Sequence, residues 1–242
     1  MHKYYYIIFI ILLTACSPNI PEINMRITQC ADCPEAIASA RAFSIHGKGY
    51  IIGGRKQDGS NTSNIYVYDA ELDSWETIPT PLRKRVNASV AVYDSLAYIG
   101  LGYNGTLHDT TSYLQDWWAY NPINNQWTQL APLPVSATDA AVNWALNGKI
   151  YVAHPFCDHY IRDVWEYDIQ TDKWQKLEDG LSITDYPERT FGAAGAVCNG
   201  RCFIGTGHFK HSSNQWSEYL PEQHQWIKLT PVPGIGRVCA TA

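Results

Sequence analysis

Four passages of the chain share one skeleton, and this repeat constrains the fold more than any other feature of the sequence. In each passage a Tyr precedes a Trp by seven residues, and an aliphatic residue follows three positions after the Trp. Successive tyrosines are 52, 47 and 52 residues apart, so the sequence predicts a structural unit of about 50 residues that occurs four times. The pairs are Tyr68 and Trp75, Tyr120 and Trp127, Tyr167 and Trp174, and Tyr219 and Trp226.

A second repeated pattern precedes each of these passages. A run of small residues leads through a tight turn to a run of β-branched and aromatic residues, and Asn-Gly turns between such runs are a strong hairpin signal. Each unit is therefore predicted to contain four antiparallel strands, with the Tyr on the third and the Trp on the fourth. The turns fall at His46-Gly47, Asp94-Ser95, Asn147-Gly148 and Asn199-Gly200.

A Gly pair such as Gly53-Gly54, followed in order by the Tyr and the Trp, resembles the kelch repeat from about Pro34 to the C-terminus. The resemblance implies an all-β fold, a kelch-type β-propeller with four recognisable four-stranded blades. Small residues on the first strands, such as Gly192-Ala193-Ala194, fit the crowded axis of a propeller. Blade three departs from the pattern, since Ala153-His154 replaces its Gly pair. The expected blades are residues 35–80, 81–132, 133–184 and 185–236.

Residues 237–242 complete the expected 35–242 propeller domain and resemble the start of a first strand, by analogy with Arg85–Val90 and Arg189–Ala194. Kelch propellers usually close with six or seven blades, so we expect the first strand of a fifth blade in a truncated six-bladed propeller. The alternative is an extra inner strand that closes a four-bladed ring. Truncation is favoured because Ala36–Ile45 already supplies the inner strand of blade one.

The first residues predict export. A short positive start, an apolar run from Tyr4 to Leu13 and the small residues before Cys16 are typical of a cleaved signal peptide over residues 1–15. Leu13-Thr14-Ala15-Cys16 also resembles the bacterial lipobox, which implies lipidation of Cys16, a tether over residues 16–34 and anchoring to the cell envelope. By the same resemblance, Ser17 favours the outer membrane or periplasmic side in a Gram-negative host. An ordinary signal peptide that happens to contain a Cys is the alternative.

Composition narrows the classes of partner. The net charge is −5, and no basic cluster extends beyond Arg83-Lys84-Arg85, so a nucleic-acid role has no electrostatic footprint. Aromatic residues make up 13% of the chain and charged residues only 17%, which suits short strands packed face to face.

Disulfides are allowed in an exported chain, but the sequence leaves the pairing open. Cys30 and Cys33 are predicted to form a local bridge or to remain free thiols. Across the Asn199-Gly200 hairpin, a two-residue turn would place Cys198 and Cys202 on opposite faces, whereas a three-residue loop would let them bond. Cys157 and Cys239 have no assigned partner.

Candidate functional residues gather on one end of the predicted propeller, where the loops between second and third strands meet the connections between blades. Arg85 and Arg189 fall at matching positions of two connections. They could clamp a carboxylate of a ligand through bidentate hydrogen bonds, or they could cap loop carbonyls and pair with Asp residues of the next blade, which we favour. The candidate binding residues are Arg55, Arg85, His154, His159, Arg189, His208 and His211.

Two enzymatic alternatives share the propeller fold. Resemblance to the sialic acid mutarotases implies anomer exchange, which needs an acid and a base near the sugar ring; weak catalytic candidates are Glu188, Arg189, Asp158 and His208. The segment from His154 to Tyr160 contains donors suited to zinc or copper, but no ligand spacing is diagnostic, and the copper ligands of galactose oxidase have no residue-by-residue match. We therefore expect no metal and no cofactor.

The sequence favours a surface-anchored binding or scaffold module for a glycan or protein partner, held to a membrane by its lipid and binding no nucleic acid. An exported sugar isomerase similar to N-acetylneuraminate epimerase is the runner-up. Such a repeat array needs no catalytic residue, so an enzyme is the less favoured class.

Overall fold

The computed structural model describes residues 27–105, 110–135, 141–153, 163–177, 192–209 and 211–240. The chain divides into two compact units, Met1–Cys30 and Ala31–Ala242. Within the first unit, the described residues 27–30 have no regular secondary structure. Over its described part, the second unit consists of β-strands and two short 3-10 helices, η1 (Thr110–Ser112) and η2 (Pro221–Gln223). None of the helices in these ranges is long and apolar enough to cross a membrane.

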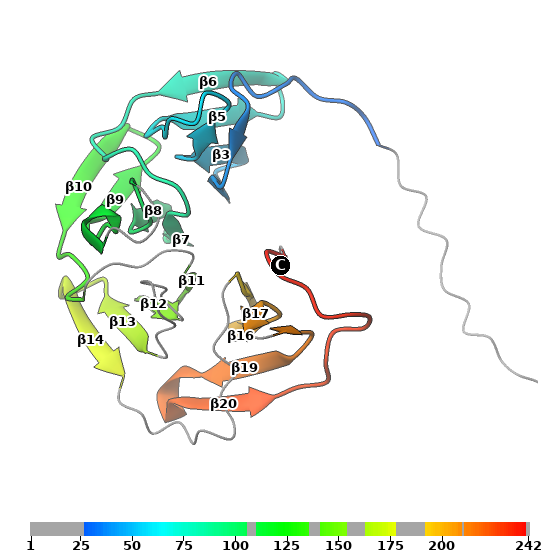
Figure 1. Cartoon of the computed structure of the whole chain (residues 1–242). Helices are drawn as coiled ribbons and strands as arrows, with labels where there is room; N and C mark the ends of the chain where they lie inside the picture. The colour runs from blue at the N-terminus through cyan, green and yellow to red at the C-terminus, as the bar shows by residue number, and fades with distance from the viewer. Residues whose placement is uncertain are drawn as a thin grey trace, which may run out of the picture. The chain divides into compact units, whose positions relative to one another are not determined.

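The predicted blades are confirmed as four antiparallel sheets, each with its strands in chain order from the propeller axis outward (Figure 1). Blade one contains β2 (Arg41–Ile45), β3 (Lys48–Ile52), β5 (Ile65–Asp69) and β6 (Ser74–Ile78), and blade two β7 (Ser89–Tyr93), β8 (Leu96–Gly100), β9 (Trp117–Asn121) and β10 (Gln126–Leu130). Blade three contains β11 (Val142–Leu146), β12 (Lys149–Ala153), β13 (Val164–Asp168) and β14 (Lys173–Leu177), and blade four β15 (Ala194–Cys198), β16 (Arg201–Gly205), β19 (Trp216–Leu220) and β20 (Gln225–Lys228). Two small ladders join β1 (Ile37–Ala38) to β4 (Arg55–Lys56) and β17 (His208–Phe209) to β18 (His211–Ser212).

The inner strands need small side chains because they crowd one another. β7 packs against both β2 and β11, and β11 packs against β15. A Cβ added at Gly195 would collide with the Val142 side chain of the neighbouring blade. The small residues predicted for the axis are therefore a steric requirement of this packing.

The first two strands of each blade are joined by two-residue turns. At Asn147-Gly148 and Asn199-Gly200 both residues have positive φ, between 51° and 76°, as a type I′ turn requires. Cys198 consequently pairs with Arg201 while Cys202 pairs with Val197, so the two Cys side chains point to opposite faces. Cys198 is exposed, Cys202 is buried, and both are free thiols.

Cys30, Cys33 and Cys239 are also free. The local Cys30–Cys33 bridge is therefore not formed, which leaves the free-thiol alternative. Cys157 lies outside the described residues.

Three hydrophobic clusters join successive blades. One joins blades one and two, a second joins blades two and three, and a third joins blades three and four. In each cluster the Tyr of the later blade is buried to 1% exposure. The repeated Tyr and Trp side chains therefore pack between neighbouring blades, where aromatic rings contribute large buried areas.

In blades one and three, the turn between the third and fourth strands carries a hydrogen-bonded staple to the preceding segment. In blade three the Tyr167 hydroxyl donates to Asp172 Oδ1 (2.7 Å), the Ala131 amide donates to the same oxygen (2.9 Å), and Trp174 Nε1 donates to the Ala131 carbonyl (2.8 Å). Asp172 has φ 54°, a conformation that Asp and Asn tolerate better than most residues.

Blade one repeats this staple with the segment that precedes it. Tyr68 donates to Asp73 Oδ1 (2.7 Å), the Ala31 amide donates to the same oxygen (2.8 Å), and Trp75 Nε1 donates to the Ala31 carbonyl (2.9 Å). Ala31 thus occupies the place that Ala131 takes between blades two and three.

The segment after blade four follows the path of an interblade connection. The Arg237 amide donates to the Ser213 carbonyl (3.0 Å) and the Arg237 carbonyl accepts from Gly207 (2.8 Å). Arg85 makes the matching contacts with Thr62 (3.1 Å) and Gly54 (2.8 Å). The analogy between residues 237 and 85 therefore holds, but residues 237–240 form one isolated bridge and no strand; residues 241 and 242 lie outside the described ranges.

Candidate functional site

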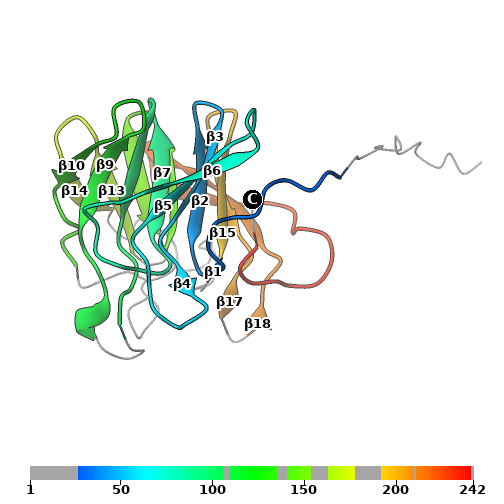
Figure 2. The ribbon, with the colours of Figure 1, turned by 90° about the horizontal axis from the view of Figure 1, so that it is seen from above.

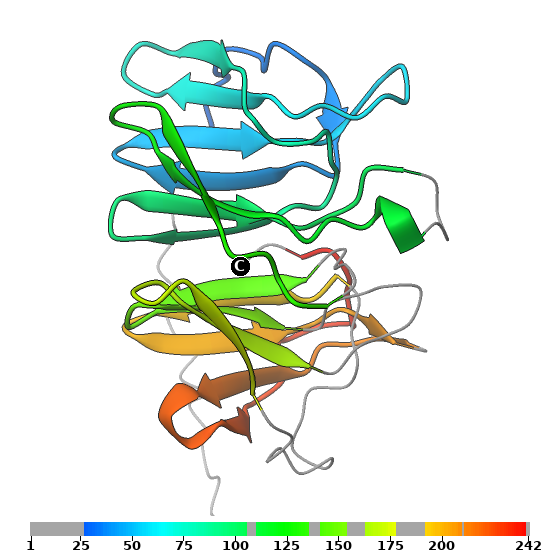
Figure 3. The same ribbon diagram turned by 90° about the vertical axis from the view of Figure 1, so that its left-hand side faces the viewer.

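The loops between second and third strands and the connections between blades lie at one end of the propeller, as expected. Figure 2 shows the small ladders β1–β4 and β17–β18 at this end, opposite the two-residue turns. In Figure 3 the four blades follow one another from blade one (blue) to blade four (orange), and the loops at this same end extend beyond their strands. We call this end the loop face.

Arg55 lies on the loop face at the start of β4 and is exposed. Its position is set by β4 pairing with β1 and by a bridge to Asn61, whose Oδ1 accepts from Arg55 Nε at 3.4 Å. The next residue, Lys56, forms an ion pair with Glu35, with its Nζ 2.7 Å from Glu35 Oε2. Arg55 therefore lies on a short paired strand and is exposed, so its guanidinium is accessible to a ligand.

Arg85, which is a candidate binding residue by sequence, takes the structural role that the sequence favoured over ligand binding. Its side chain has no exposed surface, and its guanidinium makes a bidentate pair with Asp116 of blade two, with N–O distances of 2.9 and 2.7 Å. The same group donates to the carbonyls of Arg83 (3.0 Å) and Leu101 (2.9 Å). Arg85 therefore pairs with an Asp and caps loop carbonyls, and no face of its guanidinium is left for a ligand carboxylate.

The pKa of Asp116 reflects two opposing effects, its burial and its contacts with neighbouring donors. Burial alone would raise the pKa of Asp116, but hydrogen bonds and charge from Arg85, with a further hydrogen bond from Trp118 Nε1 at 3.0 Å, outweigh burial and hold that pKa below its ordinary value. The pair is therefore ionised at neutral pH and holds the connection between blades one and two against the start of β9.

His208 and His211 lie on the β17–β18 ladder at the blade-four side of the loop face. His211 is exposed, and His208 Nδ1 lies 3.5 Å from Ser212 Oγ. In the described part of the chain, no group of three or more His, Cys, Asp or Glu side chains is placed to hold a metal ion. His211 therefore presents an exposed imidazole on the loop face, whereas His208 is partly buried.

The remaining predicted residues fall outside the described ranges. They are Cys16, His154, Asp158, His159, Glu188 and Arg189.

Arg41 is a candidate that the sequence reasoning missed. It opens the inner strand of blade one, where Ser89 and Ala194 stand in blades two and four, and its Nε donates to the Ala88 carbonyl at 3.0 Å. A charged residue within a run of axial small residues was the available signal.

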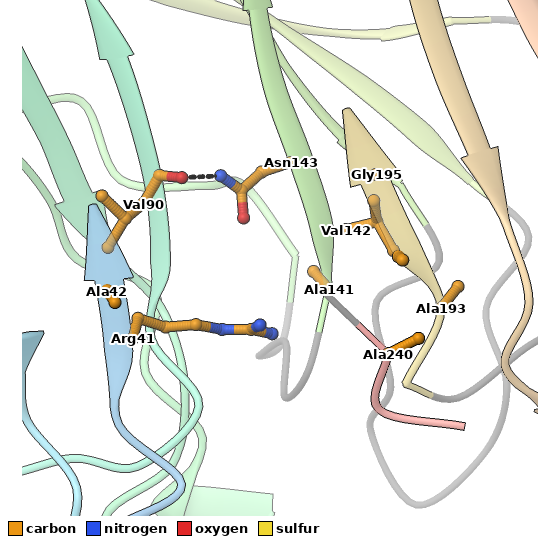
Figure 4. A pocket seen from close by; sticks show the side chains of 10 residues that line it. Arg41, Ala42, Val90, Ala141, Val142, Asn143, Ala193, Gly195 and Ala240 are labelled. Carbon is orange, nitrogen blue, oxygen red and sulfur yellow. Dashed lines mark hydrogen bonds between the residues drawn. The ribbon is translucent and has the colours of Figure 1, made fainter. Parts of the chain in front are cut away.

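Figure 4 shows Arg41 reaching from β2 toward Ala141 across a cavity on the propeller axis. Asn143 crosses the same space and donates to the Val90 carbonyl. The cavity measures about 210 Å³, below the roughly 300 to 1,000 Å³ of pockets for drug-sized ligands. Its other walls are mostly small: Ala42, Val142, Ala193, Ala194, Gly195 and Ala240.

The axial cavity and the loop face share one end of the molecule. Inner strands begin at the loop face, and the cavity lining includes Arg41 at the start of β2 and Ala194 at the start of β15. A ligand that covers the loop face therefore meets Arg55 and His211 at the rim and Arg41 toward the axis. These groups suit hydrogen bonding and anion recognition.

Comparisons with known proteins agree with this architecture. Kelch-like protein 35 of Mus musculus is 28% identical over 123 residues, which cover 50% of this chain and 19% of that protein. An N-acetylneuraminate epimerase of Yersinia enterocolitica is 28% identical over 141 residues, which cover 54% of this chain and 32% of that protein. The chain therefore spans a third or less of the length of these curated relatives.

The solved structure of YjhT has the same fold, with a TM-score of 0.73 at 17% identity over 88% of this chain and 76% of that chain. The family model of the KLHDC2/KLHL20/DRC7 Kelch-repeats domain matches residues 23–207, which is most of the chain. The repeated Tyr–Trp packing between blades is the physical counterpart of that match. The chain belongs to the Kelch-repeats domain family.

Proposed function

We propose that this protein is a binding module that holds a glycan or protein partner on the loop face of its propeller. The observation that carries the proposal is the accessible Arg55 and His211 on two short ladders of the loop face, with an axial cavity too small for a large ligand. Such an arrangement favours a partner that spreads over the face, with Arg41 contacting one protruding polar group. Membership of a repeat family in which loops carry recognition supports the same function.

A charge reversal tests the loop face. An array of neutral and anionic glycans, with wild-type protein as reference, measures binding of Arg55→Glu and of Lys173→Glu, which changes an exposed residue at the opposite, turn-bearing end. We expect Arg55→Glu to weaken binding to anionic glycans at least tenfold and Lys173→Glu to leave it unchanged. Equal losses in both variants would place binding elsewhere.

We further propose that the module is tethered to the cell envelope by a lipid on Cys16, as its lipobox-like sequence suggests. Two acyl chains give stable membrane anchoring where one is marginal. Membrane fractionation should therefore move Cys16→Ser from the membrane pellet to the soluble fraction. A variant that stays in the pellet would contradict the anchor.

A mutarotase is the second candidate function, favoured by the similarity to an N-acetylneuraminate epimerase. Exchange of the anomers of N-acetylneuraminate is followed by NMR, with Glu188→Ala and Arg189→Ala combined in one variant. Acceleration by wild type and its loss in the double variant would support this candidate and its site. No acceleration by wild type leaves the binding function alone.

A further inference from the structure

Three exposed cations, Arg55, Arg83 and Lys84, lie on the loop face where blade one leads into blade two. A backbone hydrogen bond holds their two segments side by side. The amide of Gly54, next to Arg55, donates to the carbonyl of Arg85, next to Lys84, at 2.8 Å. We call Arg55, Arg83 and Lys84 the cationic patch.

The patch differs from the neighbouring cations in its ion pairs. Lys56 pairs with Glu35, and Arg85 pairs with Asp116, each with an N–O distance of 2.7 Å. The three cations of the patch form no ion pair with any described residue. Although the whole chain has a net charge of −5, this part of the loop face therefore attracts anions.

One carboxylate, Asp58, lies close to the patch and stays ionised. Its Oδ1 accepts hydrogen bonds from the Ser60 amide (2.9 Å) and the Ser60 hydroxyl (2.7 Å). These bonds hold the pKa of Asp58 below its ordinary value, and the charges of Lys56 and Lys84 lower it further. Asp58 is exposed, so it accepts hydrogen bonds from hydroxyl groups and repels acid groups. A ligand that fits this region therefore carries both acid groups and hydroxyl groups.

The side chains around the patch suit a glycan better than a protein surface. The core of a protein–protein interface is depleted of charge and rich in aromatic anchors. Among the described residues, none of the exposed large hydrophobic side chains lies within residues 55–61 or 81–84. Apart from Gly59 and Pro81, the exposed residues there carry charged, amide or hydroxyl groups. An acidic glycan offers partners for these groups and has no apolar side chain to bury.

We propose that the cationic patch binds an acidic polysaccharide, whose acid groups meet Arg55, Arg83 and Lys84 and whose hydroxyl groups meet Asp58. This inference rests on the proposed function and deepens it by naming the class of glycan. The acid groups are carboxylates or sulfates. Arg binds a carboxylate through two parallel hydrogen bonds, and Lys acts as a point charge for either group.

Isothermal titration calorimetry with the full chain tests the patch. The probes are polygalacturonate, which carries carboxylates, dextran sulfate, neutral dextran, and poly-L-glutamate, which is acidic but has no sugar hydroxyl. We expect wild type to bind at least one of the two acidic polysaccharides, and to bind dextran and poly-L-glutamate at least tenfold more weakly. The tighter of the two acidic probes identifies the acid group. Raising the salt concentration from about 50 mM to about 200 mM should weaken this binding.

Two double variants locate the binding. Arg83→Gln combined with Lys84→Gln removes two charges of the patch and keeps the Arg83 carbonyl that accepts from Arg85. We expect it to bind the acidic polysaccharide at least tenfold more weakly. Lys173→Gln combined with Lys228→Gln is the matched control, because it removes two exposed cations from the outer strands of blades three and four. The control should bind like wild type.

Several outcomes would overturn the proposal. Equal losses in the two double variants would show attraction by overall charge alone. Poly-L-glutamate that binds as tightly as the acidic polysaccharides would indicate an acidic peptide as the ligand, and wild type that binds neither polysaccharide would exclude the proposed class. Binding that is lost in Arg55→Glu but kept in the Arg83→Gln, Lys84→Gln variant would overturn the patch and leave the proposed function standing.

Discussion

At the scale of single residues, Arg85 and Asp116 matter most because they form a buried ion pair between an interblade connection and the start of β9. Arg85 has no exposed side-chain surface and Asp116 has 17%. A pair in such surroundings is costly to break, since the surviving charge is left without a partner. Arg85 therefore contributes to the stability of the array, which is the alternative that its sequence position favoured over ligand binding.

Asp116→Asn should lower the free energy of unfolding at pH 7 by about 3 kcal/mol. The folded-state pKa of Asp116 is depressed, so the pair stabilises the protein above the unfolded-state pKa of about 3.9. This stability is lost as the pH falls through the lower folded-state pKa. Urea unfolding of both proteins at pH 7 and below pH 4 should show the difference shrinking with acidification.

Asp94→Asn is the matched control for this experiment. Asp94 is an exposed turn residue with φ 44°, a conformation that Asn accepts readily. Its replacement should leave the free energy of unfolding nearly unchanged. A difference in free energy of unfolding between wild type and Asp116→Asn that stays constant down to pH 3 would contradict the assigned ion pair.

The sequence could predict the two alternatives for Arg85 but could not decide between them. Asp116 lies 31 residues away, beyond β7 and β8, so no local pattern connects the two groups. Arg41 was missed for the opposite reason. The crowded axis already explains the small residues around it, and the equivalent positions of blades two and four, Ser89 and Ala194, carry no charge that would mark it.

At the scale of elements, the turn between third and fourth strands explains why the Tyr–Trp spacing is constant. Its αL residue is Asp73, Asn125, Asp172 or His224, with φ between 46° and 56°. This residue lies five positions after the Tyr and two before the Trp in every blade. The spacing is visible in the sequence, but only the structure shows that in blades one and three it serves a hydrogen-bonded staple.

Asp172→Ala should destabilise the protein by about 2 to 4 kcal/mol, because it leaves the Tyr167 hydroxyl and the Ala131 amide without an acceptor and strains an αL position. Asp172→Asn keeps an oxygen at that place and tolerates the same φ, so we expect a loss of less than about 1 kcal/mol. Thermal and urea unfolding of the two variants measure these losses of stability. Similar losses in the two variants would rule out the staple.

At the scale of the whole molecule, the period of about 50 residues was enough to predict the all-β propeller and its four blades. The faces between blades were harder to predict. Which residues of a strand face the preceding blade, and which face the following blade, depends on the register of four strands at once. Phe203 and Trp216 illustrate this: each looks like an ordinary strand residue, and only the register places both on one face.

Coupling between nearest neighbours should govern stability along the array. Ile204 is 1% exposed between blades three and four, and Ile204→Ala should cost about 2 to 5 kcal/mol. Native-state hydrogen exchange should then show reduced protection in blades three and four, with the amides of β2, β3 and β5 unchanged. A uniform loss of protection across all four blades would show that the molecule unfolds as one unit.

The hydrophobic clusters also decide where the polypeptide can be opened. Each cluster takes residues from two blades, so a break in a connection, for example beside Leu82 or Leu133, removes a buried contributor to a cluster. The turns at Asn147-Gly148 and His46-Gly47 contribute no buried residue to any cluster in the described ranges. Circularly permuted proteins should therefore tolerate new termini within the hairpin tips and not at the boundaries between repeats.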